Sequence, residues 1–581
     1  MKKNKKDILL LLIFYFLSIS EVISETKNIY NSNKFPFKIL SEKDENLYRK
    51  IFYYQEIGNL EKSNKLIPKV ANKLLMGNVL SQKYLHPTAW RSSYSELSNW
   101  LKYYNDHPAA TRIKWLSNKR KPKNAKSAKS PKKGYLNGVG LSKPQSFRAT
   151  IPESWKGRKS PKQTAYVALL VRKSIRKKHP TGALDILSKK KFTNYLTKSE
   201  EAHLRGEISH AYFIFGYDDK AIVTARTAIS KSPKTAYSAY WSGGLAAWRS
   251  KRYELSAIFF KTLADLNNAP EVLKSGAAFW AQRALLILNK PKEALEYLEI
   301  STENINNFYG IIGLELKGQD IKIDFSLPKI SDKFFEWIKL KKGGRRSLAL
   351  LQIGNWTEAG RELRYLYEEC PEDLKLDMMV FAANYNMPSL SFRLADLHRK
   401  ETGKNLYGAL FPLINSNFEF IVEETLLLSI IRKESGFYPL AKSRAKAIGL
   451  MQLLPSTAAF ISKDRKYRGR NKHYLYDPEK NLLLGQDYIN YLFSEPHIKG
   501  SLIKMLAAYN AGPGNLRKWL NQINHQGDIF LLIESIPSRE TRSYIKGVLY
   551  YMYIYKKRLG ENNNFLRDIL SKSAIKKILK S

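Results

Sequence analysis

The sequence predicts an all-α protein: a helical solenoid of paired helices, followed by a second α-helical domain that carries the chemistry. Three observations support this fold class. From about residue 43 to residue 301, amphipathic stretches of roughly 12 to 18 residues alternate with short polar turns, and strand-type alternation is scarce. A weak internal repeat indicates stacked helix pairs. From about residue 405 to residue 559 the composition changes, and Gly, Tyr and Asn cluster at predicted helix ends.

The first residues have the features of a secretory signal. Four lysines among the first six residues precede an apolar run over residues 8–19, which is shorter than a typical membrane span. Val22 and Ser24 are small enough for cleavage after Ser24. We therefore expect residues 1–24 to be a signal peptide and the mature chain to be soluble in the periplasm. The alternative is an uncleaved N-terminal anchor that keeps the chain at the membrane.

The overall charge favours polyanionic partners. The 581 residues include 98 Lys and Arg against 52 Asp and Glu, a formal net charge of +46. Export and the lack of a groove-reading motif exclude nucleic acid, which leaves anionic lipid and an acidic cell-wall polymer. The only cysteine, Cys370, cannot form an intramolecular disulfide. The nine histidines show no metal-ligand spacing, so no metal or cofactor is expected.

Residues 25–342 are predicted to form an α-superhelix. Residues 238–241 (Ser-Ala-Tyr-Trp) recur about 39 residues later as residues 277–280 (Ala-Ala-Phe-Trp), and each copy leads into a helix of small residues. Small residues let paired helices approach closely, which is typical of solenoids related to tetratricopeptide arrays. The repeated aromatic pairs are interpreted as core, with sugar binding as the alternative.

One segment interrupts this pattern. Between residues 114 and 133 the chain has nine basic side chains and no acids, with Pro122, Pro131 and Gly134 as turn residues. We expect a basic loop insertion near residues 117–145, which either holds an anionic polymer or is simply solvated. A helical linker module is expected at 343–404, a catalytic domain at 405–560 and a basic tail at 561–581.

Glu434 occupies a position where a charge is costly. Leu427, Ile430, Ile431 and Glu434 have the spacing that places all four on one helix face. Burial disfavours the charged form of a carboxylate and raises its pKa, and a protonated acid near neutral pH can cleave a glycosidic bond. Gly436 is expected to end the helix in a left-handed conformation, so that the acid stands at the mouth of a cleft. A partly exposed Glu at a helix end without function is the alternative.

Other polar residues follow at predicted loops and helix ends. Ser443 lies in the loop 437–446, and Gly449 after it permits close backbone approach. Gln452 is polar among apolar neighbours, so it needs a specific hydrogen-bond partner. An apolar stripe ends at Tyr509 and the turn that follows, and Tyr544 lies near the start of a third helix. Taken singly, each tyrosine is better explained as a core residue with its hydroxyl at the rim.

Most glycosidases need two carboxylates. The other acids weighed within residues 405–559 do not occupy an apolar stripe as Glu434 does, so a single-acid mechanism fits, although a partner brought close by folding stays open. These acids are Asp464, Asp477, Glu479, Asp487, Glu495, Asp528, Glu534 and Glu540.

Four motifs occur in a specific order: Glu-Ser-Gly at 434–436, Gly-Leu-Met-Gln at 449–452, Ala-Tyr-Asn-Ala-Gly at 508–512 and Glu-Thr-Arg-x-Tyr at 540–544. In this order and spacing the chain resembles the soluble lytic transglycosylases, which are bacterial cell-wall enzymes with a lysozyme-like catalytic domain. The motif resemblance covers roughly residues 405–555. The preceding helices resemble the ring-shaped α-superhelix of that family.

The resemblance implies a function and a set of site residues. Glu434 would be the single catalytic acid: it protonates the oxygen of the β-1,4 bond between N-acetylmuramic acid and N-acetylglucosamine. As a carboxylate it then takes a proton from the sugar's own 6-hydroxyl, which gives a 1,6-anhydro-N-acetylmuramic acid end. Ser443 and Tyr544 would position the acid. The residues expected to line the saccharide groove are Gly449, Met451, Gln452, Tyr509 and Asn510. Leu454 stands where family members often have Met, which leaves subsite preference open.

Two other functions stay open. A hydrolase of the same fold, like a goose-type lysozyme, would need a carboxylate-held water. A non-catalytic cell-wall protein would use its helical repeats to recruit partners. The expected partner of the enzyme is the glycan strand of peptidoglycan, together with other cell-wall proteins.

Overall fold

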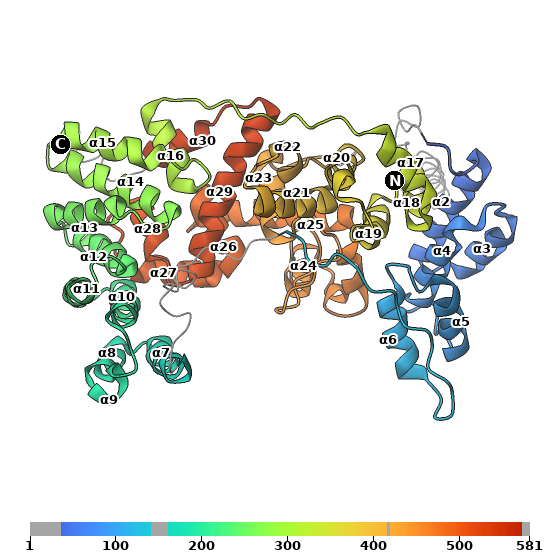
Figure 1. Cartoon of the computed structure of the whole chain (residues 1–581), viewed down its shortest axis with the longest axis horizontal. Helices are drawn as coiled ribbons and strands as arrows, with labels where there is room; N and C mark the ends of the chain where they lie inside the picture. Colours follow the sequence, from blue (N-terminus) through green and yellow to red (C-terminus); the bar gives the residue numbers. More distant parts are fainter. Residues whose placement is uncertain (1–36, 141–160, 415–418, 572–581) are drawn as a thin grey trace, which may run out of the picture. The chain divides into compact units, whose positions relative to one another are not determined.

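A computed structural model describes residues 37–140, 161–414 and 419–571 (Figure 1). The model is 68% helical with no strand among these residues, so the predicted all-α fold class is confirmed. The predicted signal peptide and residues 572–581 of the predicted tail lie outside the described residues. Within the described ranges, no helix has both the length and the apolar character needed to cross a membrane.

The chain divides into two compact units, each built from separate segments. Unit 1 comprises Met1–Leu141, Asp324–Ile421 and Glu434–Leu482; unit 2 comprises Ser142–Ile323, Val422–Lys433 and Leu483–Ser581. Each unit combines segments from several of the predicted linear domains. The proposed domain boundaries therefore remain predictions about the organisation of the sequence.

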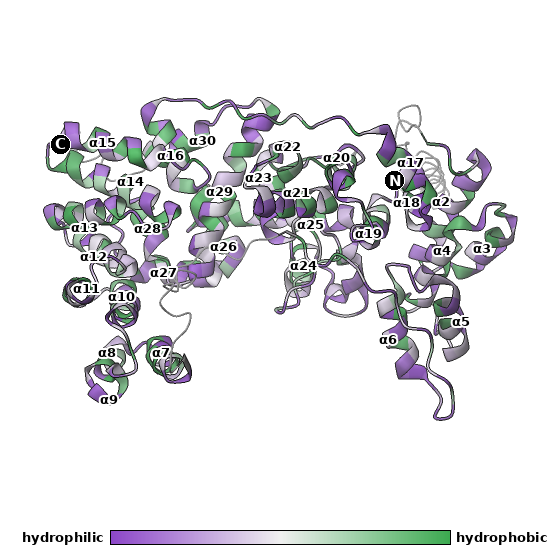
Figure 2. Ribbon diagram, viewed as in Figure 1, coloured by the Kyte–Doolittle hydropathy of each residue, from purple (hydrophilic) through white to green (hydrophobic). Residues whose placement is uncertain are grey.

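Unit 2 contains the stacked helix pairs. Consecutive helices pack on one another. Helices α13 and α15 carry both hydrophobic and hydrophilic residues, as expected for helices with one buried face, whereas α12 and most of α14 are buried on all sides (Figure 2). In order, the helices are α7 (Pro161–Arg176), α8 (Pro180–Ser188), α9 (Lys190–Thr193), α10 (Lys198–Ile214), α11 (Asp218–Lys231), α12 (Tyr237–Arg249), α13 (Tyr253–Asp265), α14 (Glu271–Ile287), α15 (Pro291–Thr302) and α16 (Phe308–Lys317).

The repeated aromatic pairs are core residues, as the sequence predicted. Trp241 is 2% exposed and Trp280 fully buried, and both rings pack against Phe260, with centroids at 5.7 and 5.9 Å. Gly244 allows this packing, because a Cβ there would lie 2.7 Å from the Phe260 ring. Small residues therefore bring the paired helices together, and the aromatic side chains have no surface left to offer a sugar.

The later helices of unit 2 pack on this solenoid. They are α26 (Leu502–Ala511), α27 (Pro513–Gln522), α28 (Ile529–Ser535), α29 (Arg539–Leu559) and α30 (Asn564–Ser571), with the body of α23 (Glu424–Glu434) and most of α25 (Pro478–Ser494). Helix α16 contacts both α29 and α30.

Asp528 links α28 to the solenoid. Its carboxylate caps α28 by accepting from the Phe530 N–H at 3.0 Å, and it binds Arg283 of α14 at 2.8 Å and the Trp248 indole of α12 at 3.2 Å. Arg283 is 2% exposed and Asp528 1%. If one partner were removed, water could not reach the other to solvate its charge.

Unit 1 combines N-terminal and central helices. They are α2 (Glu42–Glu56), α3 (Leu60–Leu66), α4 (Met76–Tyr84), α5 (Tyr94–Tyr104), α6 (Ala110–Arg120), α17 (Asp332–Leu340), α18 (Lys342–Gln352), α19 (Trp356–Leu366), α20 (Lys375–Asn384), α21 (Pro388–Thr402), α22 (Tyr407–Leu410) and α24 (Pro455–Ile461), with 3₁₀ turns at Arg465–Arg468 and Arg470–Tyr476. Gln352 holds the first described residues: its Oε1 accepts from the N–H groups of Ile39 and Leu40.

The expected basic loop is partly helical. Residues 114–120 belong to α6, because Ile113 and Ser117 give that helix a buried face that the charge count obscured. Residues 121–140 form no helix or strand, yet they pack on unit 1: Ala128 is 6% exposed, the Lys132 N–H donates to Asn105, and the Leu136 N–H donates to Arg364. Residues 121–140 therefore form a packed loop. The loop predicted near residues 117–145 begins later than expected, because residues 117–120 continue α6, and its residues 141–145 lie outside the described residues.

A buried ionic cluster lies inside unit 1. Glu362 is fully buried between Arg346, at 2.7 Å, and His107, at 3.5 Å. Burial raises the pKa of Glu362 to about 7, against the opposing influence of Arg346. Burial also lowers the pKa of His107 well below its ordinary value, so this imidazole is neutral.

The Asp528→Asn variant should lose about 3 kcal/mol of unfolding free energy, because asparagine still caps α28 but leaves the Arg283 guanidinium buried without a counter-charge. The urea midpoint of the full chain measures this loss. The matched control is Asp219→Asn, whose carboxylate is 77% exposed and pairs with Arg252, so it should change the midpoint little. Equal midpoints for the two variants would contradict the linking role of Asp528.

The pH dependence of stability should report Glu362. The folded chain holds this proton more tightly than the unfolded chain does, because the pKa rises from 4.5 to about 7. Its contribution to the unfolding free energy is therefore complete below about pH 4.5 and is lost as pH rises toward 7. In Glu362→Gln this contribution is absent. The difference in urea midpoint between parent and variant should shift with pH across that window, and a constant difference would contradict the raised pKa.

Candidate active site

Glu434 stands at the end of a helix whose apolar face is buried, as predicted. Leu427, Ile430 and Ile431 are all fully buried, and α23 ends at Glu434. The Glu434 side chain itself is half-buried. The acid is therefore presented at a helix terminus with partial access to solvent, which a general acid needs in order to reach a substrate.

Gly436 ends this helix for two separate reasons. Its φ of 55° is left-handed, a conformation that favours glycine. A Cβ at this position would also lie 2.6 Å from the carbonyl oxygen of Val139 and 3.1 Å from the ring of Phe392. The chain turns immediately after the acid because residue 436 has no side chain.

Ser443 lies in a short turn of unit 1. Its N–H donates to the Ala447 carbonyl, and its hydroxyl oxygen accepts from the Ala447 N–H, both at 3.0 Å. Isolated β-bridges join Lys442 to Ile448 and Ile448 to Leu453. The bond from Ala447 uses only the oxygen of Ser443, so the hydroxyl proton can be donated to an acceptor such as a carboxylate.

Gly449 allows the turn to sit directly on Asn481. Its φ is 85°, and a Cβ there would lie 2.2 Å from both the Asn481 amide nitrogen and the Leu475 carbonyl oxygen. Asn481 is fully buried; its oxygen accepts from the Met451 N–H, and its nitrogen donates to Ile448 and Leu475. Sequence reasoning missed Asn481, and the signal available was a polar amide at the third position after the Asp477-Pro478 helix start.

Gln452 has the specific partners that its sequence context required. Its side-chain nitrogen donates to the carbonyls of Gly449, at 2.8 Å, and Ala441, at 3.2 Å. Met451 differs from expectation: its side chain is fully buried, so it supports the turn from inside and is not on the surface where a sugar would bind. Leu454 is 40% exposed beside this turn.

Tyr509, Asn510 and Tyr544 lie together in unit 2. Helix α26 ends at Ala511, and the capping residue Gly512 has a φ of 86°. The rings of Tyr509 and Tyr544 stack with centroids 6.3 Å apart and an interplanar angle of 7°. Thr541 donates to the Asn510 side-chain oxygen at 2.7 Å. The Glu-Thr-Arg-x-Tyr motif thus fixes the end of α26 through Thr541, a residue that sequence reasoning did not single out.

Arg542 holds the start of α29 in place. Its guanidinium is buried and donates to the Ile536 carbonyl and to Nε2 of His210, at 3.0 Å for the latter. Burial and the neighbouring Arg542 lower the pKa of His210 well below its ordinary value, so the imidazole is neutral and can accept this bond.

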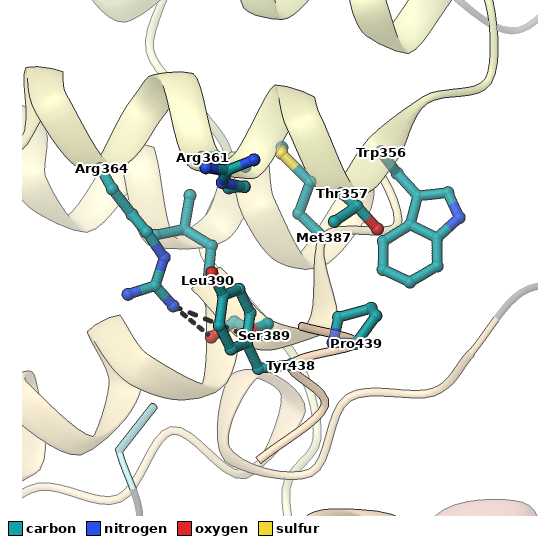
Figure 3. A pocket seen from close by; sticks show the side chains of 10 residues that line it. Trp356, Thr357, Arg361, Arg364, Met387, Ser389, Leu390, Tyr438 and Pro439 are labelled. Carbon is teal, nitrogen blue, oxygen red and sulfur yellow. Dashed lines mark hydrogen bonds between the residues drawn. The ribbon is translucent and has the colours of Figure 1, made fainter. Parts of the chain in front are cut away.

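Arg364 of α19 supports the loop after Glu434. This residue is 3% exposed and donates from Nη1 to the carbonyls of Leu136 and Gly138, at 2.9 and 2.8 Å. Its other nitrogen reaches Ser389, and its guanidinium lies 5.7 Å from the ring centroid of Tyr438 (Figure 3). Trp356, Arg361 and Met387 line the same small cavity. Residues 136–140 and the post-acid loop are therefore held by one arginine.

Two other carboxylates of the catalytic segment are buried, contrary to the sequence analysis. Asp528 pairs with Arg283, and Glu534 is 2% exposed in the apolar run of α28. Glu534 accepts from Lys546 and from the Tyr309 hydroxyl, both at 2.6 Å. Although burial opposes it, the cations Lys546 and Arg542 lower the pKa of Glu534, so it stays ionised and does not act as a proton donor.

No group of three or more His, Cys, Asp or Glu side chains within the described ranges is arranged to hold a metal ion. Cys370 is buried, and burial raises the pKa of its thiol to about 12.

Comparison with known protein families and with curated relatives identifies a known domain in this part of the chain. Residues 414–530 match the family model of the transglycosylase SLT domain, a range that includes Glu434, Ser443 and Asn510. The chain is 28% identical over 301 residues to the soluble lytic murein transglycosylase of Salmonella typhimurium, covering 50% of this chain and 45% of that protein. Against the Escherichia coli K12 protein of the same name, the identity is 28% over 298 residues, covering 49% and 44%. The chain thus aligns with somewhat less than half the length of these curated relatives.

Solved structures show the same fold. The 70-kDa soluble lytic transglycosylase in complex with bulgecin A matches with a TM-score of 0.57 and 17% identity, covering 90% of this chain and 97% of that chain. An inactive Glu-to-Gln mutant of the lytic transglycosylase Slt from Pseudomonas aeruginosa matches with a TM-score of 0.51 and 20% identity, covering 89% and 81%. The predicted resemblance to the soluble lytic transglycosylases is confirmed by the domain match over residues 414–530 and by these relatives.

Proposed function

We propose that this chain is an exported lytic transglycosylase that cleaves the β-1,4 bond between N-acetylmuramic acid and N-acetylglucosamine in peptidoglycan, with Glu434 as its single catalytic carboxylate. The observation that carries the proposal is the state of the acids within and around the matched domain. Asp528 and Glu534 are buried in ion pairs, so neither carboxylate can reach a substrate. Glu434 is half-buried at a helix end beside a turn built from family motifs.

The chemistry needs one proton donor and no water. The Glu434 carboxyl gives its proton to the glycosidic oxygen as the bond from C1 to that oxygen breaks. The resulting carboxylate takes the proton of the 6-hydroxyl while that oxygen bonds to C1. The product is the 1,6-anhydro ring, and Glu434 is protonated again at the end of the cycle. A hydrolase would need a second group to hold water, and we assign none.

The other site residues have supporting roles in this proposal. Ser443 would donate its hydroxyl proton to Glu434 once the acid is ionised, because its oxygen already accepts from Ala447. Tyr544 would also position the acid. The Lys433 side chain, from the residue before the acid, lies close to Gly547, which is about one helical turn beyond Tyr544 in α29. Tyr509, Asn510, Gly449 and Gln452 would contact the saccharide, and Met451 would hold the turn beneath them.

Three further parts of the proposal rest on sequence and on relatives. Export to the periplasm depends on the predicted signal at residues 1–24. Peptidoglycan as the partner is supported by the relatives, which are named murein transglycosylases, and by the structural match to a transglycosylase bound to bulgecin A. The solved Glu-to-Gln mutant described as inactive supports a glutamate as the essential group in this fold.

Glu434→Gln should lower the rate of peptidoglycan release from purified sacculi by roughly 10³-fold, because glutamine cannot supply the proton. Mass spectrometry of the parent's soluble products should find termini one water lighter than reducing ends. The control is Glu424→Gln at the opposite end of the same helix, which should keep activity within about twofold. Unchanged release by Glu434→Gln would defeat the mechanism.

Arg364→Lys tests the support of the post-acid loop. Lysine cannot reach the carbonyls of Leu136 and Gly138 together with Ser389, so the loop after Glu434 should shift. We expect kcat to fall roughly tenfold with KM little changed, because a small misplacement of the acid slows the chemical step.

The matched control for that prediction is Arg345→Lys, an exposed arginine of α18. Circular dichroism at the assay temperature confirms that both variants are folded. A rise in KM with constant kcat would show that Arg364 serves substrate binding and not the position of the acid.

A further inference from the structure

An open cavity of about 380 Å³ lies in unit 1, and none of the residues assigned above lines it. It is bordered by the end of α4, by residues 85–91 and by one face of α6. Three arginines and no carboxylate line it. The lining residues are Tyr84, Leu85, His86, Pro87, Thr88, Trp90, Arg91, Arg112, Leu116 and Arg120.

Helix geometry directs two of these arginines into the cavity. Arg112, Leu116 and Arg120 are spaced four residues apart along α6, so they share one helix face. The neighbouring face, about a quarter of a turn around the helix, is buried through Ile113 and Ser117. Arg120 is tethered by hydrogen bonds to the carbonyl and, at 2.6 Å, the hydroxyl of Ser92, which fixes one wall of the cavity.

Aromatic rings hold cations around the same opening. The guanidinium of Arg112 and the ammonium of Lys119 lie 4.1 and 4.2 Å from the ring centroid of Trp115. Lys83 lies 4.0 Å from the ring of Trp90. Since cations already occupy these ring faces, the tryptophans orient positive charge and are poorly placed to stack on a sugar.

The cavity has no internal counter-charge. None of the three arginines forms an ion pair with any residue that the structure describes. Burial lowers the pKa of His86, and its Nδ1 accepts from the N–H groups of Thr88 and Ala89, so this ring is neutral. The loop that follows α6 adds exposed lysines, among them Lys121, Lys123, Lys126 and Lys129. Like charges this close repel one another, and a bound anion relieves that repulsion.

Arginines suit a particular kind of anion. A guanidinium presents a planar fork of donors that matches a carboxylate or phosphate in two parallel hydrogen bonds. Arg112 also acts electrostatically on Tyr476, so the cavity adjoins the 3₁₀ turn that leads into α25 and Asn481 in the same unit. A polymer held at the cavity would run close to the turn that carries Gly449 and Gln452.

We propose that this arginine-lined cavity and the adjoining basic loop form a second binding site, which takes carboxylates of the peptide stems of peptidoglycan. This inference rests on the proposed function for the identity of the polymer. The site would hold the substrate by its anionic stems, apart from the saccharide groove, and so add a charge-dependent affinity to the recognition of the glycan.

The test uses the full chain in a Glu434→Gln background, so that sacculi are bound without being cut. Arg91→Glu/Arg112→Glu reverses two exposed charges of the cavity and leaves the tethered Arg120 intact. The matched control, Lys190→Glu/Lys191→Glu, makes the same change of charge at two exposed lysines of α9. Co-sedimentation gives the dissociation constant for native sacculi and for sacculi whose carboxylates have been amidated with carbodiimide and ammonia.

We expect the Glu434→Gln chain and the lysine control to bind native sacculi roughly tenfold more tightly than amidated sacculi. The arginine variant should bind both equally and weakly. Equal binding of native sacculi by the arginine variant and the lysine control would overturn the proposal. Binding to vesicles of phosphatidylglycerol is measured in the same way. If the arginine variant lost affinity for these vesicles but not for sacculi, the proposal would also be overturned, and the cavity would be assigned to lipid phosphate.

The outcome is separable from the fate of the proposed function. Peptidoglycan cleavage by the parent chain is measured independently, by the mass of released termini. If the parent releases nothing but still prefers native sacculi through Arg91 and Arg112, the catalytic proposal fails and the binding site stands. If the parent cleaves peptidoglycan and the arginine variant binds sacculi as tightly as the lysine control does, the catalytic proposal stands and the binding site fails.

Discussion

The abrupt end of α23 is the constraint on which the candidate site depends. Gly436 has a left-handed φ, and it has no room for a Cβ beside Val139 and Phe392. The helix therefore stops two residues earlier, at Glu434, with its apolar face buried and its last side chain half-exposed. A general acid must be desolvated enough to hold a proton and open enough to reach a substrate, and a helix terminus provides both.

The distribution of buried acids gives the site its chemical character. The side chains of Asp528 and Glu534 are nearly inaccessible to solvent. Each carboxylate is bound to a cation and to a neutral donor, so each has a structural role. Glu362 is buried with Arg346, and its raised pKa makes the unfolding free energy depend on pH. Reading function from a buried carboxylate alone would have selected all three. Their inaccessibility separates these structural acids from Glu434, which stands half-exposed at a helix end.

Much of the fold and part of the site could be predicted from the sequence. The 3.6-residue periodicity, the small residues of the repeat and the glycine after Glu434 are local signals, and each predicts the observed helix packing or helix end. What failed depended on partners distant in the chain. The burial of Asp528 requires Arg283 and Trp248, and the ordering of residues 121–140 requires Asn105 and Arg364. Asn481 of α25 supports the turn that contains Gly449 and Met451, and no spacing rule connects these positions.

We propose that the single carboxylate of Glu434 cleaves the glycan without consuming water. The most direct measurement is digestion of sacculi by the full chain in water enriched in oxygen-18, followed by mass spectrometry of the new sugar termini. Our proposal predicts termini that carry no oxygen-18, because the 6-hydroxyl of the same sugar closes the ring. Incorporation of one oxygen-18 atom per cleaved bond would contradict it and would identify a hydrolase.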